Sequence, residues 1–209
     1  PHILFESCSG GGGRYDAGML YYMPQTWTSD NTDPIARLKI QYSTSLVYPI
    51  STMGAHVSAI PNHQTGRETS LDIRGNVAMS GVLGYELDLT TLSEEEKVLI
   101  VKQVDFYKEH RQLLQFGDFV RLKSPYEENE VAWMFVSKDK KEAIVFYFRV
   151  LVEASAPYVT LKLAHLDETL EYQIANHVIS GDALMNIGMY IDPKLHGDYA
   201  TQAFILKAK

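Results

Sequence analysis

The sequence predicts an α/β domain followed by an all-β domain: the second half of a (βα)8 TIM-type barrel over residues 1–117, then a C-terminal antiparallel β-sandwich over 118–209. Up to Gly117, short apolar runs alternate with helix-like segments, which is the pattern of βα units. From Asp118 onward, short β-rich runs are separated by polar turns. Four parallel βα units with both sheet edges open would be an unusual complete fold, so the first part indicates half of an eight-stranded barrel.

Four strands are expected in the first part, each followed by a polar or glycine-rich loop: 2–6, 21–28, 54–60 and 85–89. The first of these is expected to be buried.

Helix starts are marked by capping residues. Asp33 as N-cap and Pro34 in the first turn predict a helix to about residue 45. A short helix is expected over 74–79. The clearest local signal is the capping box of Ser93 and Glu96, followed by apolar residues at helical spacing, which predicts a helix that closes at Gly117.

The second part reads as β-structure with one weak helical period near 182–189. A charged turn at 137–141 joins the first two of the expected strands, which are 132–136, 143–152, 158–163, 170–174 and 201–207.

Composition excludes several classes of function. The formal net charge of −7 argues against nucleic acid and against an anionic membrane surface as partners, and favours a neutral ligand. No apolar run approaches the ~20 residues of a spanning helix. The single cysteine, Cys8, allows no internal disulfide and no zinc cluster. We therefore expect a reducing, cytoplasmic compartment, and we expect neither a metal nor another cofactor.

The chain opens on Pro1 without a methionine, and its apolar pattern begins at once with Ile3, Leu4 and Phe5. No basic segment or small-residue cleavage site of a signal peptide precedes that pattern. We expect the chain to be a piece of a longer polypeptide.

In a βα barrel the active site lies where strands meet their following loops. The first such loop is 6–14, with four glycines at 10–13 that let the backbone approach a ligand and direct N–H groups at it. A flexible linker is the alternative, but the run ends in Arg-Tyr-Asp, and its spacing matches no phosphate loop. Cys8 either fills space or shapes a pocket floor; no histidine is placed beside it to activate a nucleophile.

The second loop is 27–33. Asp33 is accounted for by the helix cap, whereas Asp30 has no such local duty. Trp27 supplies an aromatic face of the kind that sugars stack on, and an aspartate near such a wall can have a raised pKa and act as a general acid. A second turn-forming residue is the alternative, and the residues alone leave both open.

A third loop carries Asn62 and His63, for which a solvated loop is the alternative to ligand contact. His56, inside an apolar run, is expected to be a hydrogen-bonded core residue.

Three segments together resemble the bacterial α-galactosidases of glycoside hydrolase family 36: residues 6–16 (ESCSGGGGRYD), 27–33 (WTSDNTD) and 53–66 (MGAHVSAIPNHQTG). The resemblance continues through the capped helix and thins after about residue 155. It implies a retaining glycosidase, in which one carboxylate attacks the anomeric carbon and a second protonates the leaving oxygen and then activates water.

The resemblance implies that Asp30 is the acid/base, and it implies a set of substrate-binding residues: Cys8 and Gly11 as galactose contacts, Ser9 and Gly10 in the same loop, and Trp27 and Ser29 as pocket neighbours. The family's nucleophile is an aspartate in a Lys-Trp-Asp-like context, which this chain lacks. Glu6 and Asp16 are the nearby carboxylates, and neither matches that motif. The chain alone is therefore expected to be inactive.

The resemblance further implies that the full-length parent releases terminal α-linked galactose from melibiose and raffinose-type oligosaccharides, without a metal, as a homo-oligomer for which a tetramer is expected. The alternative is a non-catalytic carbohydrate-binding or assembly module derived from such an enzyme. An enzyme for a related sugar such as α-N-acetylgalactosamine is a third possibility.

Overall fold

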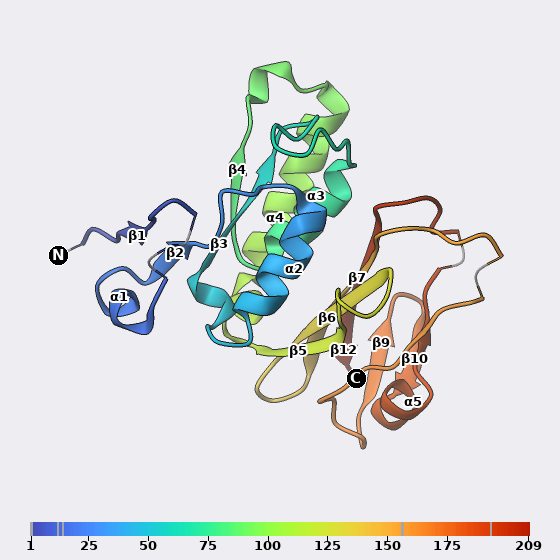
Figure 1. Cartoon of the computed structure of the whole chain (residues 1–209). Coiled ribbons are helices and arrows are strands. Elements are labelled where there is room, and N and C mark those ends of the chain that lie inside the picture. Colours follow the sequence, from blue (N-terminus) through green and yellow to red (C-terminus); the bar gives the residue numbers. More distant parts are fainter. Residues whose placement is uncertain (1, 12, 14, 156, 193) are drawn as a thin grey trace. The chain divides into compact units, whose positions relative to one another are not determined.

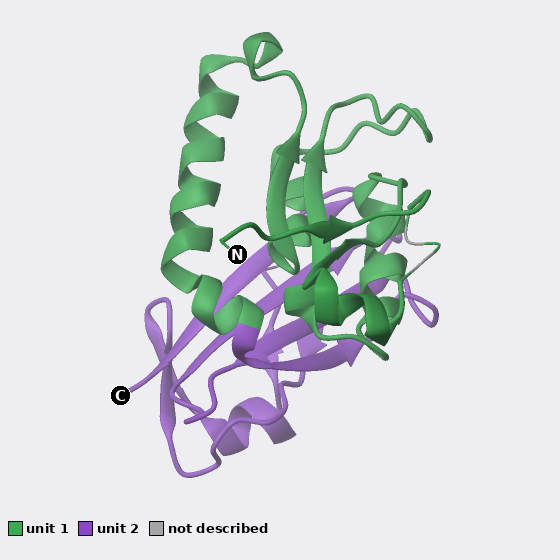
Figure 2. Ribbon diagram, turned by 90° about the vertical axis from the view of Figure 1, so that its left-hand side faces the viewer, with its two compact units in different colours: residues 1–115 green, residues 116–209 purple. Residues whose placement is uncertain are grey.

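A computed structural model describes residues 2–11, 13, 15–155, 157–192 and 194–209. The chain divides into two compact units, Pro1–Gln115 and Phe116–Lys209, which Figure 2 colours separately. Each is described by itself. No helix among the described residues is long and apolar enough to cross a membrane.

The first unit is built on a parallel sheet whose strands lie side by side in the order in which they occur in the chain (Figure 1). Its strands are β1 (Glu6–Ser7), β2 (Gln25–Trp27), β3 (Met53–Ser58) and β4 (Val82–Glu86). Successive right-handed crossovers in that order bring their helices to the same face of a sheet. The observed α/β organisation agrees with the prediction from the alternating apolar runs.

The helices of this unit are α1 (Ala17–Tyr22), α2 (Pro34–Thr44), α3 (Leu71–Met79) and α4 (Glu94–Phe116), with short 3-10 segments at Ile50–Thr52 and Leu89–Thr91. Ala55 and Val57 of β3 pack against Leu71 and Ala78 at the two ends of α3. Because side chains alternate along a strand, Gly54 and His56 belong to the opposite face.

Both predicted caps are confirmed. The Asp33 side chain accepts a hydrogen bond from the Ile35 amide at 3.2 Å, at the start of α2. At the start of α4, the Ser93 amide donates to Glu96 Oε2 at 3.0 Å and the Glu96 amide donates to Ser93 Oγ at 3.2 Å.

Three expected strands of this unit were placed wrongly. The run 85–89 overlaps β4 at two residues only, because the strand begins earlier, where Val82 and Leu83 pair with β3.

The other two are the first and second runs. Of the first run, 2–6, only Glu6 lies in β1 and pairs with β2, and Leu4 is 85% exposed, because β1 is an edge strand of two residues. The run 21–28 begins in α1, whose N-cap Asp16 accepts from the Met19 amide at 2.9 Å, so the strand starts at Gln25.

The second unit contains a six-stranded antiparallel sheet in the order β10-β9-β12-β7-β6-β5, a two-stranded sheet and one helix. The elements are β5 (Asp118–Lys123), β6 (Glu130–Val136), β7 (Glu142–Arg149), β8 (Thr160–Leu161), β9 (Glu171–Ile174), β10 (His177–Ser180), α5 (Gly181–Asn186), β11 (Met189–Tyr190) and β12 (Ala200–Ala208). The strands β5, β10 and β11 were not predicted; β5 and β10 form the two edges of the large sheet, and β11 is only two residues long.

One face of the large sheet packs against the small sheet and α5, and there Met134, Tyr147, Leu161 and Leu184 are buried together. The opposite face carries an aromatic cluster from β6 and β7: Trp133, Phe135, Phe146 and Phe148, each at most 1% exposed. The rings of Trp133 and Phe148 lie 4.9 Å apart between centroids.

Candidate active site

The loops that follow β1 and β2 lie next to each other. Glu6 pairs with Gln25, and Ser7 pairs with Thr26, in parallel register. Since parallel strands end at the same edge of a sheet, the segment after Ser7 and the segment after Trp27 leave the sheet together. The predicted site residues of both loops are thereby brought into one region.

The glycine loop touches the aspartate. An ideal Cβ on Gly11 would lie 2.5 Å from the Asp30 amide nitrogen, 3.0 Å from Asp30 Cγ and 3.2 Å from Oδ2. Gly11 also has a φ of +71°, a region that favours glycine. A residue without a side chain is thus required at position 11 for two independent reasons, and the linker alternative for this loop is not needed.

Gly10 of the same loop is less constrained than Gly11. Gly10 has a φ of +58°, and a Cβ there would meet nothing within 4 Å. The Gly13 amide donates to the Ser9 carbonyl at 3.0 Å, which closes the loop. Cys8 is exposed, and Gly12 and Arg14 of the predicted motif lie outside the described residues.

The carboxylate of Asp30 is held by the indole of Trp27, whose Nε1–H donates to Asp30 Oδ1 at 3.1 Å. Around it, the Asn31 amide donates to Ser29 Oγ at 3.1 Å, so the loop is stabilised by its own side chains. Asp30 is exposed to solvent, whereas Trp27 is only 9% exposed. The two form a polar group on a buried aromatic support, which is an arrangement suited to proton transfer at a sugar oxygen.

Trp27 packs against two other side chains that sequence reasoning did not connect with it. Its ring centroid lies 4.5 Å from that of His56, and the Arg37 guanidinium carbon lies 4.9 Å from the Trp27 centroid. Gly54 makes room for the indole, since a Cβ there would stand 3.1 Å from Trp27 Cε3. These contacts fix the ring that holds Asp30.

His56 is not a core residue as expected. Its side chain is 29% exposed, and its Nδ1 lies 3.4 Å from Glu86 Oε2. The alternation of β3 buries Ala55 and Val57 under α3 and places His56 on the face that carries Trp27.

Asn62 does not lie in a solvated loop; its side chain is buried and holds two loops together. It is 2% exposed, donates to Thr32 Oγ1 at 3.1 Å, and accepts from the Gln64 and Thr65 amides at 3.0 and 3.1 Å. It therefore joins the loop after β3 to the loop after β2. His63, the adjacent candidate, is exposed.

The other carboxylates near the site have partners of their own. Glu6 accepts a hydrogen bond from Gln25 Nε2, Asp16 caps α1, and Asp33 forms an ion pair with Arg67. Among the residues that the structure describes, no group of three or more histidine, cysteine, aspartate or glutamate side chains is arranged to hold a metal ion.

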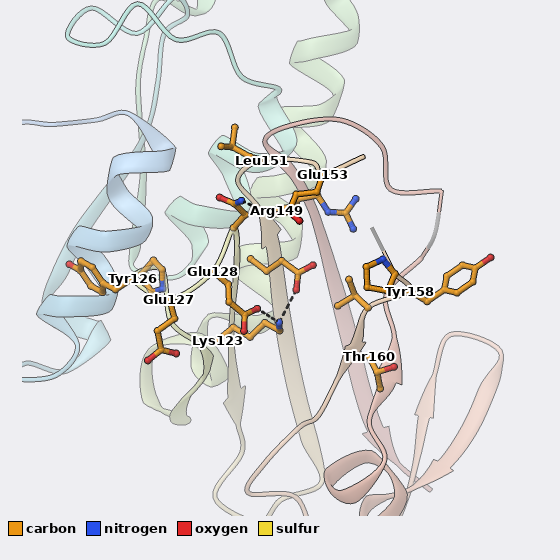
Figure 3. Close-up of a pocket in the computed structure, with 14 residues that line it drawn as sticks. Lys123, Tyr126, Glu127, Glu128, Arg149, Leu151, Glu153, Tyr158 and Thr160 are labelled. Atoms are coloured by element: carbon orange, nitrogen blue, oxygen red, sulfur yellow. Dashed lines mark hydrogen bonds and ion pairs between the residues drawn. The ribbon is translucent and has the colours of Figure 1, made fainter. Parts of the chain in front are cut away.

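The second unit contains a separate cavity of about 670 Å³ (Figure 3). Lys123 lies between two of its carboxylates, at 2.6 Å from Glu128 Oε2 and 2.8 Å from Glu130 Oε2. Its lining includes none of the predicted site residues. Two of its four carboxylates are paired with Lys123, and none of its lining residues belongs to the motifs of the first unit.

Comparison with known proteins shows the family of the chain. Residues 1–117 match the family model Melibiase, and residues 130–206 match the model of the glycosyl hydrolase family 36 C-terminal domain. The chain belongs to the melibiases of glycoside hydrolase family 36. The Geobacillus stearothermophilus α-galactosidase AgaA is 63% identical over 209 residues, and the Lactobacillus acidophilus α-galactosidase Mel36A is 53% identical over 211 residues.

Solved family 36 structures superimpose closely on the chain. A crystal structure of an AgaA variant in complex with raffinose covers 100% of this melibiase chain at a TM-score of 0.98 and 61% identity. The α-galactosidase from Lactobacillus brevis covers 99% at a TM-score of 0.95. The chain spans 28% of the length of AgaA and of Mel36A, and all of it is matched in both.

Proposed function

We propose that this chain is the part of a retaining α-galactosidase that supplies the catalytic acid/base, Asp30. The observation that carries the proposal is the position of its carboxylate, hydrogen-bonded by Trp27 and in contact with the Gly11 backbone, in a melibiase family chain. The relatives named above are α-galactosidases, which supports the same reaction class here.

We propose that residues 1–117 form four βα units of a (βα)8 barrel, and that 118–209 form the family's β-sandwich. The sequential parallel order β1-β2-β3-β4 supports the barrel, because such a sheet carries its helices on one face and leaves the other for the interior. The aromatic side chain of Trp27 and the polar side chains of His56 and Glu86 are grouped on that other face. In a closed barrel this face would be the inner one.

The geometry suggests how Asp30 acts. Trp27 Nε1–H occupies Oδ1, which leaves Oδ2 to carry the transferable proton. In the first step, the proton moves from Asp30 to the glycosidic oxygen as its bond to the anomeric carbon breaks, while a nucleophilic carboxylate from another strand of a longer polypeptide forms the glycosyl–enzyme bond. In the second step, Asp30 takes a proton from water, whose oxygen attacks the anomeric carbon and releases the nucleophile.

The remaining predicted residues form the proposed sugar subsite, in which the loop of Cys8, Ser9, Gly10 and Gly11 faces the hydroxyls and Trp27 offers an aromatic wall. Ser29 is a pocket neighbour whose polar groups bond within the protein: its carbonyl accepts from Arg37 Nη1 at 3.2 Å, and its hydroxyl accepts from the Asn31 amide.

The proposed substrates are melibiose and raffinose-type oligosaccharides with a terminal α-linked galactose. AgaA variants have been crystallised with raffinose and with stachyose, which supports this substrate class. We also propose a cytoplasmic homo-oligomer, with a tetramer as the expected form. The isolated 209-residue chain should release no galactose, because it lacks the family's nucleophile motif.

The decisive experiment replaces Asp30 by alanine in a polypeptide of the relatives' full length that contains this chain. We expect kcat/KM for melibiose to fall by about 10²–10⁴-fold, the usual contribution of general acid–base catalysis. For a dinitrophenyl α-galactoside, whose leaving group needs no proton, kcat/KM should change little. Asp105→Ala, an exposed aspartate on α4, is the matched control and should behave as the unmodified enzyme.

An equal effect of Asp30→Ala on both substrates would refute the acid/base role. If the unmodified full-length polypeptide binds raffinose in calorimetry but releases no galactose, the alternative of a non-catalytic carbohydrate-binding module is correct. Galactose release by the isolated chain would overturn the assignment of the nucleophile to another segment.

A further inference from the structure

Arg37 is a buried cation in the first turn of α2. It is 2% exposed, and burial lowers its pKa to about 10, against the opposing influence of Glu86. Its guanidinium donates to neutral oxygens: Nη2 to the Gly54 carbonyl at 2.5 Å, Nη1 to the Ser29 carbonyl at 3.2 Å and Nε to Gln41 Oε1 at 3.2 Å. Burying a cation among neutral groups is costly, so its position requires an explanation beyond packing.

Two of its contacts lead to Asp30. The guanidinium lies 4.9 Å from the ring centroid of Trp27, within the range of a cation–π contact, and the same indole donates to Asp30 Oδ1. The second contact, with the Ser29 carbonyl, holds the main chain of the residue immediately before Asp30. One side chain thus constrains the carboxylate through its hydrogen-bond donor and through its backbone.

Arg37 is itself anchored. Gln41, one turn later on α2 and 2% exposed, donates from Nε2 to the Val77 carbonyl at 2.9 Å and to the Ser80 carbonyl at 3.4 Å. The guanidinium is therefore tied to the end of α3 as well as to β3 through Gly54. Such a support is rigid, which is what a positioned catalytic group requires.

We infer that Arg37 is a positioning residue for Asp30, acting through the indole of Trp27 and the carbonyl of Ser29. The inference rests on the proposed function, because it concerns how the acid/base is held. A planar guanidinium suits this role, since its donors point in fixed directions while its face lies on an aromatic ring; the ammonium of lysine offers neither property.

The test uses Arg37→Lys and Arg37→Gln in the full-length polypeptide. We expect kcat/KM for melibiose to fall by about 10–10²-fold, as for a misplacement on the order of 1 Å, with KM little changed. For a dinitrophenyl α-galactoside, the fall in kcat/KM should be less than about threefold. If Arg37 contributed only to stability, its replacement would lower kcat/KM for both substrates by the same factor or for neither. The readout is therefore the ratio of the two kcat/KM values.

Azide gives a second readout. It attacks the glycosyl–enzyme at the anomeric carbon and needs no base, because no proton has to leave it, and the product is galactosyl azide. Azide should therefore accelerate the dinitrophenyl reaction of the Arg37 variants, as it should for Asp30→Ala. Lys39→Gln, an exposed cation on the same helix, is the control and should show neither effect.

Trp27→Phe keeps an aromatic ring and removes the N–H, so it tests the same connection if the Arg37 variants fail to fold. We expect the same preferential loss on melibiose and the same azide rescue. Suppose that Asp30→Ala lowers kcat/KM for melibiose much more than for the dinitrophenyl substrate, whereas folded Arg37 or Trp27→Phe variants show no such difference. The inference about Arg37 is then wrong. If Asp30→Ala does not discriminate either, the proposed function fails first.

Discussion

The α-carbon of Gly11 lies against the main chain and the carboxylate of Asp30. Two residues nineteen positions apart therefore form one unit, in which the glycine loop forms a wall beside the acid/base. Any side chain at position 11 would enter the space that Asp30 occupies. The glycine is thus explained by the position of the aspartate.

Gly11→Ala should displace Asp30 and lower kcat/KM for melibiose by about 10²-fold, because a misplacement on the order of 1 Å at a catalytic group has an effect of that size. Gly66→Ala is the matched control, since Gly66 has a similar φ of +68° but a Cβ there would meet nothing within 4 Å. Both variants carry the same backbone strain. Comparable losses in the two would show that strain, and not contact with Asp30, is responsible.

Asn62→Ala should lower the free energy of unfolding by about 1–3 kcal/mol, because it removes a buried side chain that accepts hydrogen bonds from the Gln64 and Thr65 amides and donates one to Thr32 Oγ1. Urea denaturation followed by circular dichroism would measure this. His63→Ala, at the exposed neighbouring position, should stay within about 0.5 kcal/mol of the unmodified chain. Equal values for the two variants would contradict the structural assignment of Asn62.

Phe146→Ala should destabilise the chain by about 3–5 kcal/mol, the usual effect of removing a buried aromatic ring. Phe146 is 0% exposed and contacts the rings of Phe135 and Phe148. Tyr158→Ala removes a ring that is 76% exposed and should be nearly neutral. The measurement is the midpoint and slope of urea unfolding for both variants, and a small effect of Phe146→Ala would mean that the aromatic cluster is not packed as described.

The phenol of Tyr85 should lose its proton at a higher pH than an exposed tyrosine. Burial raises its pKa to about 12, and its hydroxyl donates to Gln103 Oε1 at 2.9 Å. Because the folded-state pKa lies above the usual tyrosine value of 10.0, the contribution of Tyr85 to stability is complete below pH 10 and is lost as the pH rises through about 12.

Alkaline titration of tyrosinate absorbance checks this expectation. Tyr85→Phe should remove one component near pH 12 and should flatten the loss of stability between pH 10 and 12. Tyr21→Phe, which removes a phenol 85% exposed, should leave that component in place. A titration curve that Tyr85→Phe does not alter in this range would disprove the burial of this hydroxyl.

The sequence by itself determined the features that depend on neighbouring residues. The caps at Asp33 and Ser93 involve groups within three positions of each other, so these residue types predict the helix starts directly. The alternation of apolar runs and helix-like segments indicated the α/β fold class, and the resemblance of the motifs around Cys8 and Asp30 indicated the family. Where local signals were weak, as in the exposed edge run 2–6, the prediction was wrong.

Only the tertiary structure decided how the site residues meet. Parallel register brings Gly11 to Asp30 and His56 to Trp27, and no local pattern encodes these contacts. The sequence does indicate that Arg37 is buried, since it shares one face of α2 with Pro34, Leu38 and Gln41 at helical spacing. What it contacts there depends on segments 8 to 17 residues away in the chain, which is why the structure was needed to find its connection with Asp30.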